Sequence, residues 1–144
     1  MSAARLSVVA RLSVPDLAAA LRAGARAHGD WDRVAAVELV IQHESWLHRA
    51  DFRRFVELDR STGTAWLDLR KLAGWVDESR ASSSETAILR LACLLVGATP
   101  DDPVALSEPQ WVLKYILRPL GQVNAALAAE AVRYAACGPA RPSS

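Results

Sequence analysis

Apolar residues recur every three or four positions along most of this chain, a spacing that is typical of amphipathic helices. The first such run begins after Ser13 and Pro15, a pair typical of a helix start, and it ends at Gly29. Its apolar side is rich in small residues, so we expect a partner helix to approach it closely. Further helices are expected over residues 30–47, 49–58, 69–78 and 83–96, between Ser107 and Pro119, and over residues 122–136. Asp68 is expected to cap the helix at 69–78.

The helix expected at 83–96 has the clearest start. Ser82 is followed three residues later by Glu85, the spacing of a capping box in which each side chain bonds to the backbone N–H of the other. Only Glu85 and Arg90 are charged within this helix. We therefore expect it to be the most buried element, with Leu91 in the core.

Two segments show patterns expected of short strands. Residues 6–14 alternate between apolar and polar side chains, which predicts either an edge strand or a loosely docked leader. Residues 64–67 predict a second short strand, directly after the turn residues 59–63. The expected fold class is mainly all-α, an irregular bundle of about six or seven helices with at most a minor β contribution.

Length and composition indicate one globular domain. The 144 residues include 51% hydrophobic and 23% charged residues, which excludes a disordered chain. We expect a leader or edge strand at 1–13, a single helical domain at 14–137 and a flexible tail at 138–144. The net charge of +1 argues against binding that is dominated by bulk positive charge.

Residue usage adds two expectations. The 15 Arg, 2 Lys and 27 Ala residues form a bias typical of a GC-rich genome, so abundant arginine is weak evidence for phosphate binding. Cys93 and Cys137 both lie in apolar runs, which indicates free, reduced thiols in a cytoplasmic protein; a disulfide between two helix faces is the alternative. We expect no membrane association, since no run approaches the ~18 apolar residues of a membrane span. We also expect no cofactor.

The string His43–His48 is the candidate for a metal or catalytic site. A zinc-protease helix carries histidines at i and i+4, one above the other. Here the two histidines are at i and i+5, about 140° apart on a helix that turns ~100° per residue, so we expect no metal site. His43 falls on the same side as Val40 and Leu47, which predicts a core histidine. An enzyme with a site near His43 and Glu44 is one alternative function.

Three arginines form a candidate binding cluster. Arg49, Arg53 and Arg54 could grip the phosphates of a nucleic acid, and the helices at 34–58 would then belong to a DNA-binding transcriptional regulator, a second alternative function. Acidic residues are interleaved with these arginines and would cancel much of the local potential. Nucleic acid is therefore not the favoured partner.

Trp75 is the aromatic candidate for a binding surface. It lies off the apolar stripe of Leu69, Leu72 and Val76, so its ring is expected at the rim of the buried face with one edge in water. An aromatic ring in that position offers a large contact area at a small entropy cost. We expect binding to centre on Trp75 rather than on the arginines.

The sequence carries no recognisable catalytic set. It has no G-x-S-x-G elbow, no phosphate-binding loop of the G-x-x-x-x-G-K-[ST] type and no C-x-x-C pair. A good core, near-neutral charge and spare aromatic residues favour a small adaptor or regulatory protein. It would act by protein–protein interaction, with a protein partner or with a second copy of itself.

Two segments carry a resemblance to known proteins. Residues Ser82–Ala92 and the stretch from Val123 to Gly138 resemble uncharacterised helical proteins of GC-rich actinobacteria. The matching positions are helix caps and core residues. The resemblance implies a helical fold, and it transfers neither an activity nor a functional residue.

Overall fold

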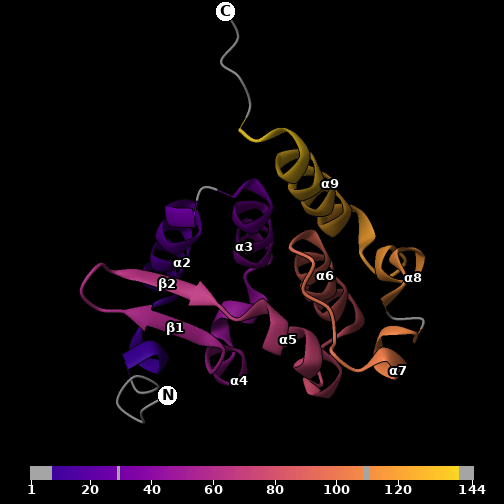
Figure 1. Ribbon diagram of the computed structural model, residues 1–144, viewed down its shortest axis with the longest axis horizontal. Coiled ribbons are helices and arrows are strands. Elements are labelled where there is room, and N and C mark those ends of the chain that lie inside the picture. Colours follow the sequence, from indigo (N-terminus) through magenta and orange to yellow (C-terminus); the bar gives the residue numbers. More distant parts are fainter. Residues whose placement is uncertain (1–7, 29, 109–110, 140–144) are drawn as a thin grey trace, which may run out of the picture.

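The computed structural model describes residues 8–28, 30–108 and 111–139, and within them the fold is mainly helical with one small antiparallel sheet, as predicted (Figure 1). Five longer helices form the body: α2 (Val14–His28), α3 (Trp31–His43), α5 (Leu69–Trp75), α6 (Ser83–Leu95) and α9 (Gly121–Cys137). Shorter elements lie between them: η1 (Ser45–His48), α4 (Ala50–Arg53), β1 (Val56–Asp59), β2 (Thr64–Leu67), η2 (Val76–Glu78), α7 (Pro103–Leu106) and α8 (Leu113–Leu117). The four-residue α7 is a helix that the pattern did not predict.

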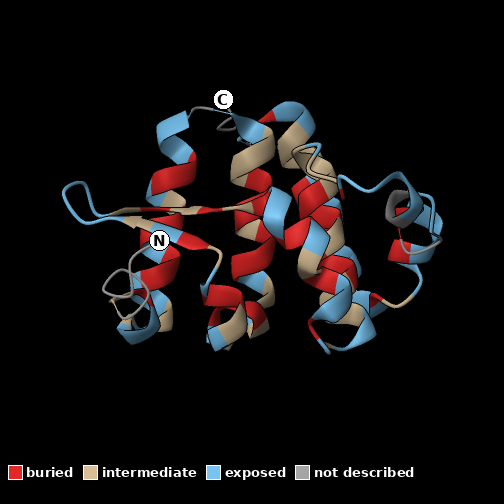
Figure 2. Ribbon diagram, turned by 60° about the horizontal axis from the view of Figure 1, so that its bottom comes forward, coloured by how far each residue is buried: buried red, intermediate tan, exposed pale blue. Residues whose placement is uncertain are grey.

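Helix α3 lies at the centre of the body. It packs against α2, α6 and α9, and Figure 2 shows the buried residues along the inner sides of these helices. The helix predicted at 83–96 is deeply buried as expected: Leu91 is 3% exposed, and Ile88 and Leu89 are fully covered. Helix α3 is buried to a similar extent, with Ala36 and Val40 fully covered.

Local capping signals define the starts of α5 and α6 as the sequence predicts. Ser82 and Glu85 form the complete capping box at the start of α6. The Asp68 side chain accepts a hydrogen bond from the backbone N–H of Lys71 at 3.0 Å, which caps α5. These bonds satisfy N–H groups that have no partner inside the helix.

The prediction of a helix over 49–58 is wrong in its second half. Helix α4 ends at Arg53, and the chain then forms β1, in which Val56 pairs with Leu67 and Asp59 pairs with Thr64 of β2. Residues 56–59 alternate between covered and open positions, and pairing with β2 extends them into a strand. The predicted strand at 64–67 is confirmed as β2.

The close neighbour of α2 is β2, where we expected a helix. A Cβ atom at Gly24 would collide with the backbone carbonyl of Ala65 in β2. The small residue therefore lets the sheet lie directly on the helix (Figure 1).

Both ends of the described chain differ from the expected leader and tail. Residues 8–11 form a helical turn in place of an edge strand, and Val9 within it is buried. Gly138 is buried against the ring of Trp31, so the chain is still packed at the start of the predicted tail. Residues 1–7 and 140–144 lie outside the described residues.

Candidate functional site

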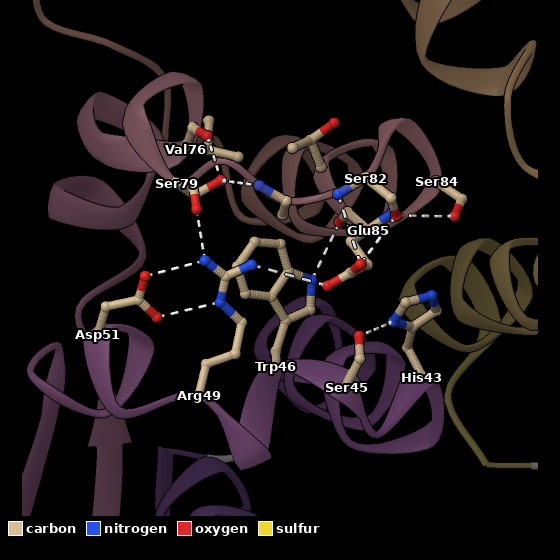
Figure 3. Close-up of polar contacts among 12 residues, drawn as sticks. His43, Ser45, Trp46, Arg49, Asp51, Val76, Ser79, Ser82, Ser84 and Glu85 are labelled. Carbon is tan, nitrogen blue, oxygen red and sulfur yellow. Dashed lines mark hydrogen bonds and ion pairs between the residues drawn. The ribbon is translucent and has the colours of Figure 1, made fainter.

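The connection between α3 and α4 determines where most of the predicted site residues lie. Helix α3 ends at His43, four residues earlier than predicted, because Glu44 takes a positive φ of 66° and donates its N–H to the carbonyl of Ile41. The chain then turns into η1, which brings Ser45, Trp46 and Arg49 beside the N-terminus of α6 (Figure 3).

The Arg49 side chain contacts α4, the residue that follows η2 and the first turn of α6. Its guanidinium makes two hydrogen bonds to Asp51, at 3.0 and 2.9 Å, and a further one to the carbonyl of Ser79 (Figure 3). It also lies 3.8 Å from the carboxylate of Glu85 and stacks over the Trp46 ring. The hydrogen bonds from Arg49 lower the pKa of Asp51. Much of the hydrogen-bonding capacity of Arg49 is therefore used within the fold.

Arg53 is buried and does not lie on a binding surface, which corrects the sequence-based expectation. Its Nη1 donates to the carbonyls of Val9 and Leu12, at 3.0 and 2.7 Å, and its Nε donates to the carbonyl of Leu47 at 2.8 Å. Only 9% of the residue is exposed. The guanidinium fork thus fastens the N-terminal turn to η1.

Trp75 and Arg54 both contact Phe55. The half-buried Trp75 ring lies 5.1 Å from the Phe55 ring and 6.1 Å from that of Trp46, between ring centres. Arg54 is exposed, and its guanidinium lies 5.6 Å from the Phe55 ring. Of the four predicted binding residues, Trp75 is half-buried and Arg54 is exposed. Arg54 forms no ion pair with the described residues.

The cluster around His43 has the composition of a hydrolytic site but not its order. His43 Nδ1 lies 2.9 Å from Ser45 Oγ, and Ser45 also interacts with Glu85 (Figure 3). The serine therefore stands between imidazole and carboxylate, whereas in a catalytic triad the imidazole stands between the other two groups. Burial lowers the pKa of His43, with the Glu85 charge acting in the opposite direction, which keeps this half-buried ring neutral at pH 7.

Glu85 completes the capping box of α6, whose N-cap is Ser82. Its carboxylate accepts a hydrogen bond from Ser82 Oγ at 2.8 Å. Burial pushes the pKa of Glu85 upward, but the bonds from Ser82 and the Arg49 charge outweigh it, and the net shift is downward. The Trp46 indole N–H adds a bond to the Glu85 backbone carbonyl at 3.0 Å. This set of contacts fixes the start of α6.

The end of α3 also changes the argument about metal binding. Since α3 stops at His43, His43 and His48 do not share one helix, and the angle between them on a helix no longer applies. Across residues 8–28, 30–108 and 111–139, no group of three or more His, Cys, Asp or Glu side chains is placed to hold a metal ion.

Sequence reasoning missed an exposed apolar surface around α8. Of eight exposed large apolar residues in the described chain, six lie between positions 104 and 123. We call the part formed by Val112, Leu113, Tyr115 and Leu117, with the cations Lys114 and Arg118, the α8 surface. These four apolar residues are each 44–52% exposed.

The α8 surface is held to the body by residues on its other side. Ile116 is 1% exposed and Trp111 is 6% exposed, and α8 packs against α6. In Figure 2 this segment lies at one edge of the molecule, where pale blue exposed residues gather. The run from Trp111 to Leu117 is almost wholly apolar, so it places apolar groups on every side of a short helix, and this signal in the sequence could have found the surface.

No helix of the described residues is long and apolar enough to span a membrane. No protein-family model, curated protein or solved structure matches this chain.

Proposed function

We propose that this chain is a small adaptor or regulatory protein that acts by binding another protein through its α8 surface. The exposure of Leu113, Tyr115 and Leu117 on one short helix carries the proposal. Contiguous exposed apolar groups of this kind are typical of protein interaction sites. Covering them would contribute about 25 cal/mol for each Å² of apolar area removed from water.

The charges on the α8 surface suggest the chemistry of the partner. Lys114 and Arg118 flank the Tyr115 ring, at 5.9 and 5.5 Å from its centre. Both are exposed, so they can meet acidic groups at the rim of an interface. A partner with an apolar surface and neighbouring carboxylates fits this arrangement.

Trp75 is a weaker centre for an interface than the sequence suggested. Its ring already packs against Trp46 and Phe55, so it has less area to offer. The DNA-binding alternative loses support for a similar reason, since Arg53 is buried and Arg49 is paired with Asp51.

The buried Cys93 and exposed Cys137, both free thiols, fit the reducing cytoplasm that we propose as the location of the protein.

Photo-crosslinking in the native host tests the proposal. A photoreactive phenylalanine derivative replaces Leu113, and in a matched control it replaces Ala19, which is exposed on α2. We expect a discrete crosslinked protein from position 113 and none from position 19. The double change Lys114→Glu/Arg118→Glu should abolish that product. The same products from both positions would contradict the proposal.

A second comparison locates the centre of binding. Leu113→Ser and Leu117→Ser together should remove the crosslinked partner in a pull-down, whereas Trp75→Ala should leave most of it. Circular dichroism must first show that both variants are folded. Loss of the partner with Trp75→Ala alone would return the centre to Trp75. Light scattering of the purified protein separates a foreign partner from self-association.

A further inference from the structure

A groove of about 590 Å³ runs between α2, α3 and α9, away from the α8 surface. This volume lies within the roughly 300–1,000 Å³ typical of small-molecule sites. Its apolar floor comes from α3 and α9: Ala35, Leu39 and Ala131 are buried, and Val34 and Leu127 are half-buried beside them.

Most charged groups that line the groove are already neutralised within the fold. Glu38 accepts two hydrogen bonds from Arg22, at 2.9 and 2.8 Å, and a third from Gln42 at 2.7 Å. These bonds, with those from Arg22 the strongest, lower the pKa of Glu38 and keep it ionised. Glu130 makes two hydrogen bonds to Arg133, at 2.9 and 2.7 Å.

Arg26 is the cation of the groove that remains without a hydrogen bond to the described residues. It lies one helical turn after Arg22 on α2 and is exposed, and it attracts Glu38 only through space. The hydroxyl of the half-buried Tyr134 also has no hydrogen-bond partner among the described residues. Both side chains line the groove, where they can bond to a ligand.

Arg26 and Tyr134 lie at the same end of the groove. Consecutive helices α2 and α3 run in opposite directions, so the pairing of Arg22 with Glu38 places Arg26 toward the start of α3 (Figure 1). Tyr134 lies one turn before Gly138, whose backbone packs on Trp31, the first residue of α3. The apolar floor extends from this end toward the other.

We propose that this groove binds a small organic carboxylate with an apolar chain. Its carboxylate would accept hydrogen bonds from the guanidinium of Arg26 and the hydroxyl of Tyr134, and its chain would lie along Leu39 and Leu127. The free positive charge at one end selects an anionic head, and bonds to a charged donor are about twice as strong as neutral ones. The apolar floor selects a chain over a wholly polar anion.

Isothermal titration calorimetry with octanoate tests the proposal, with octan-1-ol and octylammonium as matched neutral and cationic probes. We expect saturable one-to-one binding of octanoate, at least about tenfold weaker binding of octan-1-ol, and no binding of octylammonium. Equal affinity for octanoate and octan-1-ol would overturn the assignment of the carboxylate to Arg26. Absence of saturable octanoate binding would overturn the site itself.

Variants then place the ligand. Arg26→Gln should weaken octanoate binding by about tenfold or more, whereas Arg60→Gln, which removes an exposed arginine in the β1–β2 turn, should not change it. Leu127→Trp should block binding by filling the groove. Unchanged binding in either Arg26→Gln or Leu127→Trp would overturn the proposal. A melting curve for each variant must first show that it is folded.

This inference does not depend on the proposed protein partner. Leu113→Ser with Leu117→Ser should leave octanoate affinity unchanged, because the α8 surface does not line the groove. Loss of octanoate binding in a folded Leu113→Ser/Leu117→Ser variant would contradict the location of the site.

Discussion

The part of the chain from Val14 to Leu95 and the part from Pro103 to Cys137 are both rich in apolar residues, but they bury them differently. Among the described residues of the first part, Trp31 is the one large apolar side chain that is exposed. Among the described residues of the second part seven are exposed, from Val104 to Val132. The first part is a closed core, and the second covers that core on one side and offers apolar groups to solvent on the other.

Buried polar groups do not separate the two parts, since each part holds one buried side-chain nitrogen without a hydrogen-bond partner among the described residues. In the first part, Arg53 donates hydrogen bonds to the carbonyls of Val9, Leu12 and Leu47, and the Trp46 indole N–H is bonded to Glu85. The buried Nε of Arg90 in the same part has no hydrogen-bond partner among the described residues. In the second, the buried Trp111 indole N–H has no hydrogen-bond partner among the described residues. An unmade buried hydrogen bond costs about 1–3 kcal/mol. The exposed apolar residues are therefore what distinguishes the second part, which has apolar surface left for binding.

We expect the largest difference between the two parts in the reaction rates of their cysteine thiols. Cys93 is buried on α6, and burial raises its pKa to about 12, whereas Cys137 is exposed at the end of α9. Cys137 should react readily with a thiol reagent, and Cys93 at least about 10³-fold more slowly, because it must wait for the core to open. Reaction rates with and without denaturant measure this. Two fast thiols in the native protein would contradict a closed core.

Removing an arginine should have a large effect in the first part and a small one in the second. Arg53→Met leaves the carbonyls of Val9, Leu12 and Leu47 without their donor, and we expect a loss of about 3–5 kcal/mol in the free energy of unfolding. The matched control Arg118→Met lies on the exposed α8 surface and should change stability by about 0.5 kcal/mol or less. Denaturant melts measure both, and equal effects would remove the distinction.

Truncating one leucine in each part to alanine compares how much each side chain contributes to stability. Leu91→Ala creates a cavity in the core and should destabilise the protein by about 2–5 kcal/mol. Leu113→Ala removes a side chain that is 52% exposed and should cost less than about 1 kcal/mol. A change below about half a kilocalorie for Leu91→Ala would refute the burial of α6.

The smallest expected effect is the pH dependence of the contribution that Glu38 makes to stability. Its pKa is lowered, first by the hydrogen bonds from Arg22, so its ionised form stabilises the fold above the unfolded pKa, and this contribution is lost as pH falls through the folded pKa. Both side chains are more than a third exposed, so solvent screening limits the contribution to about 1 kcal/mol or less. Glu38→Gln should therefore be less stable near neutral pH, and the difference should shrink in acid. A difference that grows in acid would contradict this assignment.

Several features of the protein follow from short stretches of sequence. The capping box of Ser82 and Glu85, the Asp68 cap and the strand at 64–67 were all predicted, and the structure confirms them. Each depends on residues within a few positions of one another, so its physical cause is contained in the local sequence. The burial of Leu91 follows in the same way from an almost uncharged helix.

Other features were decided only when distant segments came together. Arg53 is buried because the carbonyls of Val9 and Leu12, more than forty residues earlier, accept its hydrogen bonds. Residues 56–59 form a strand because β2 pairs with them, and the groove exists because α9 lies against α3. The capped starts of α5 and α6, the helical class and much of the core could be predicted from the sequence, since they depend on local bonds and periodicity. Tertiary structure alone decided which arginine is buried and which apolar groups face solvent, because both depend on packing between remote elements.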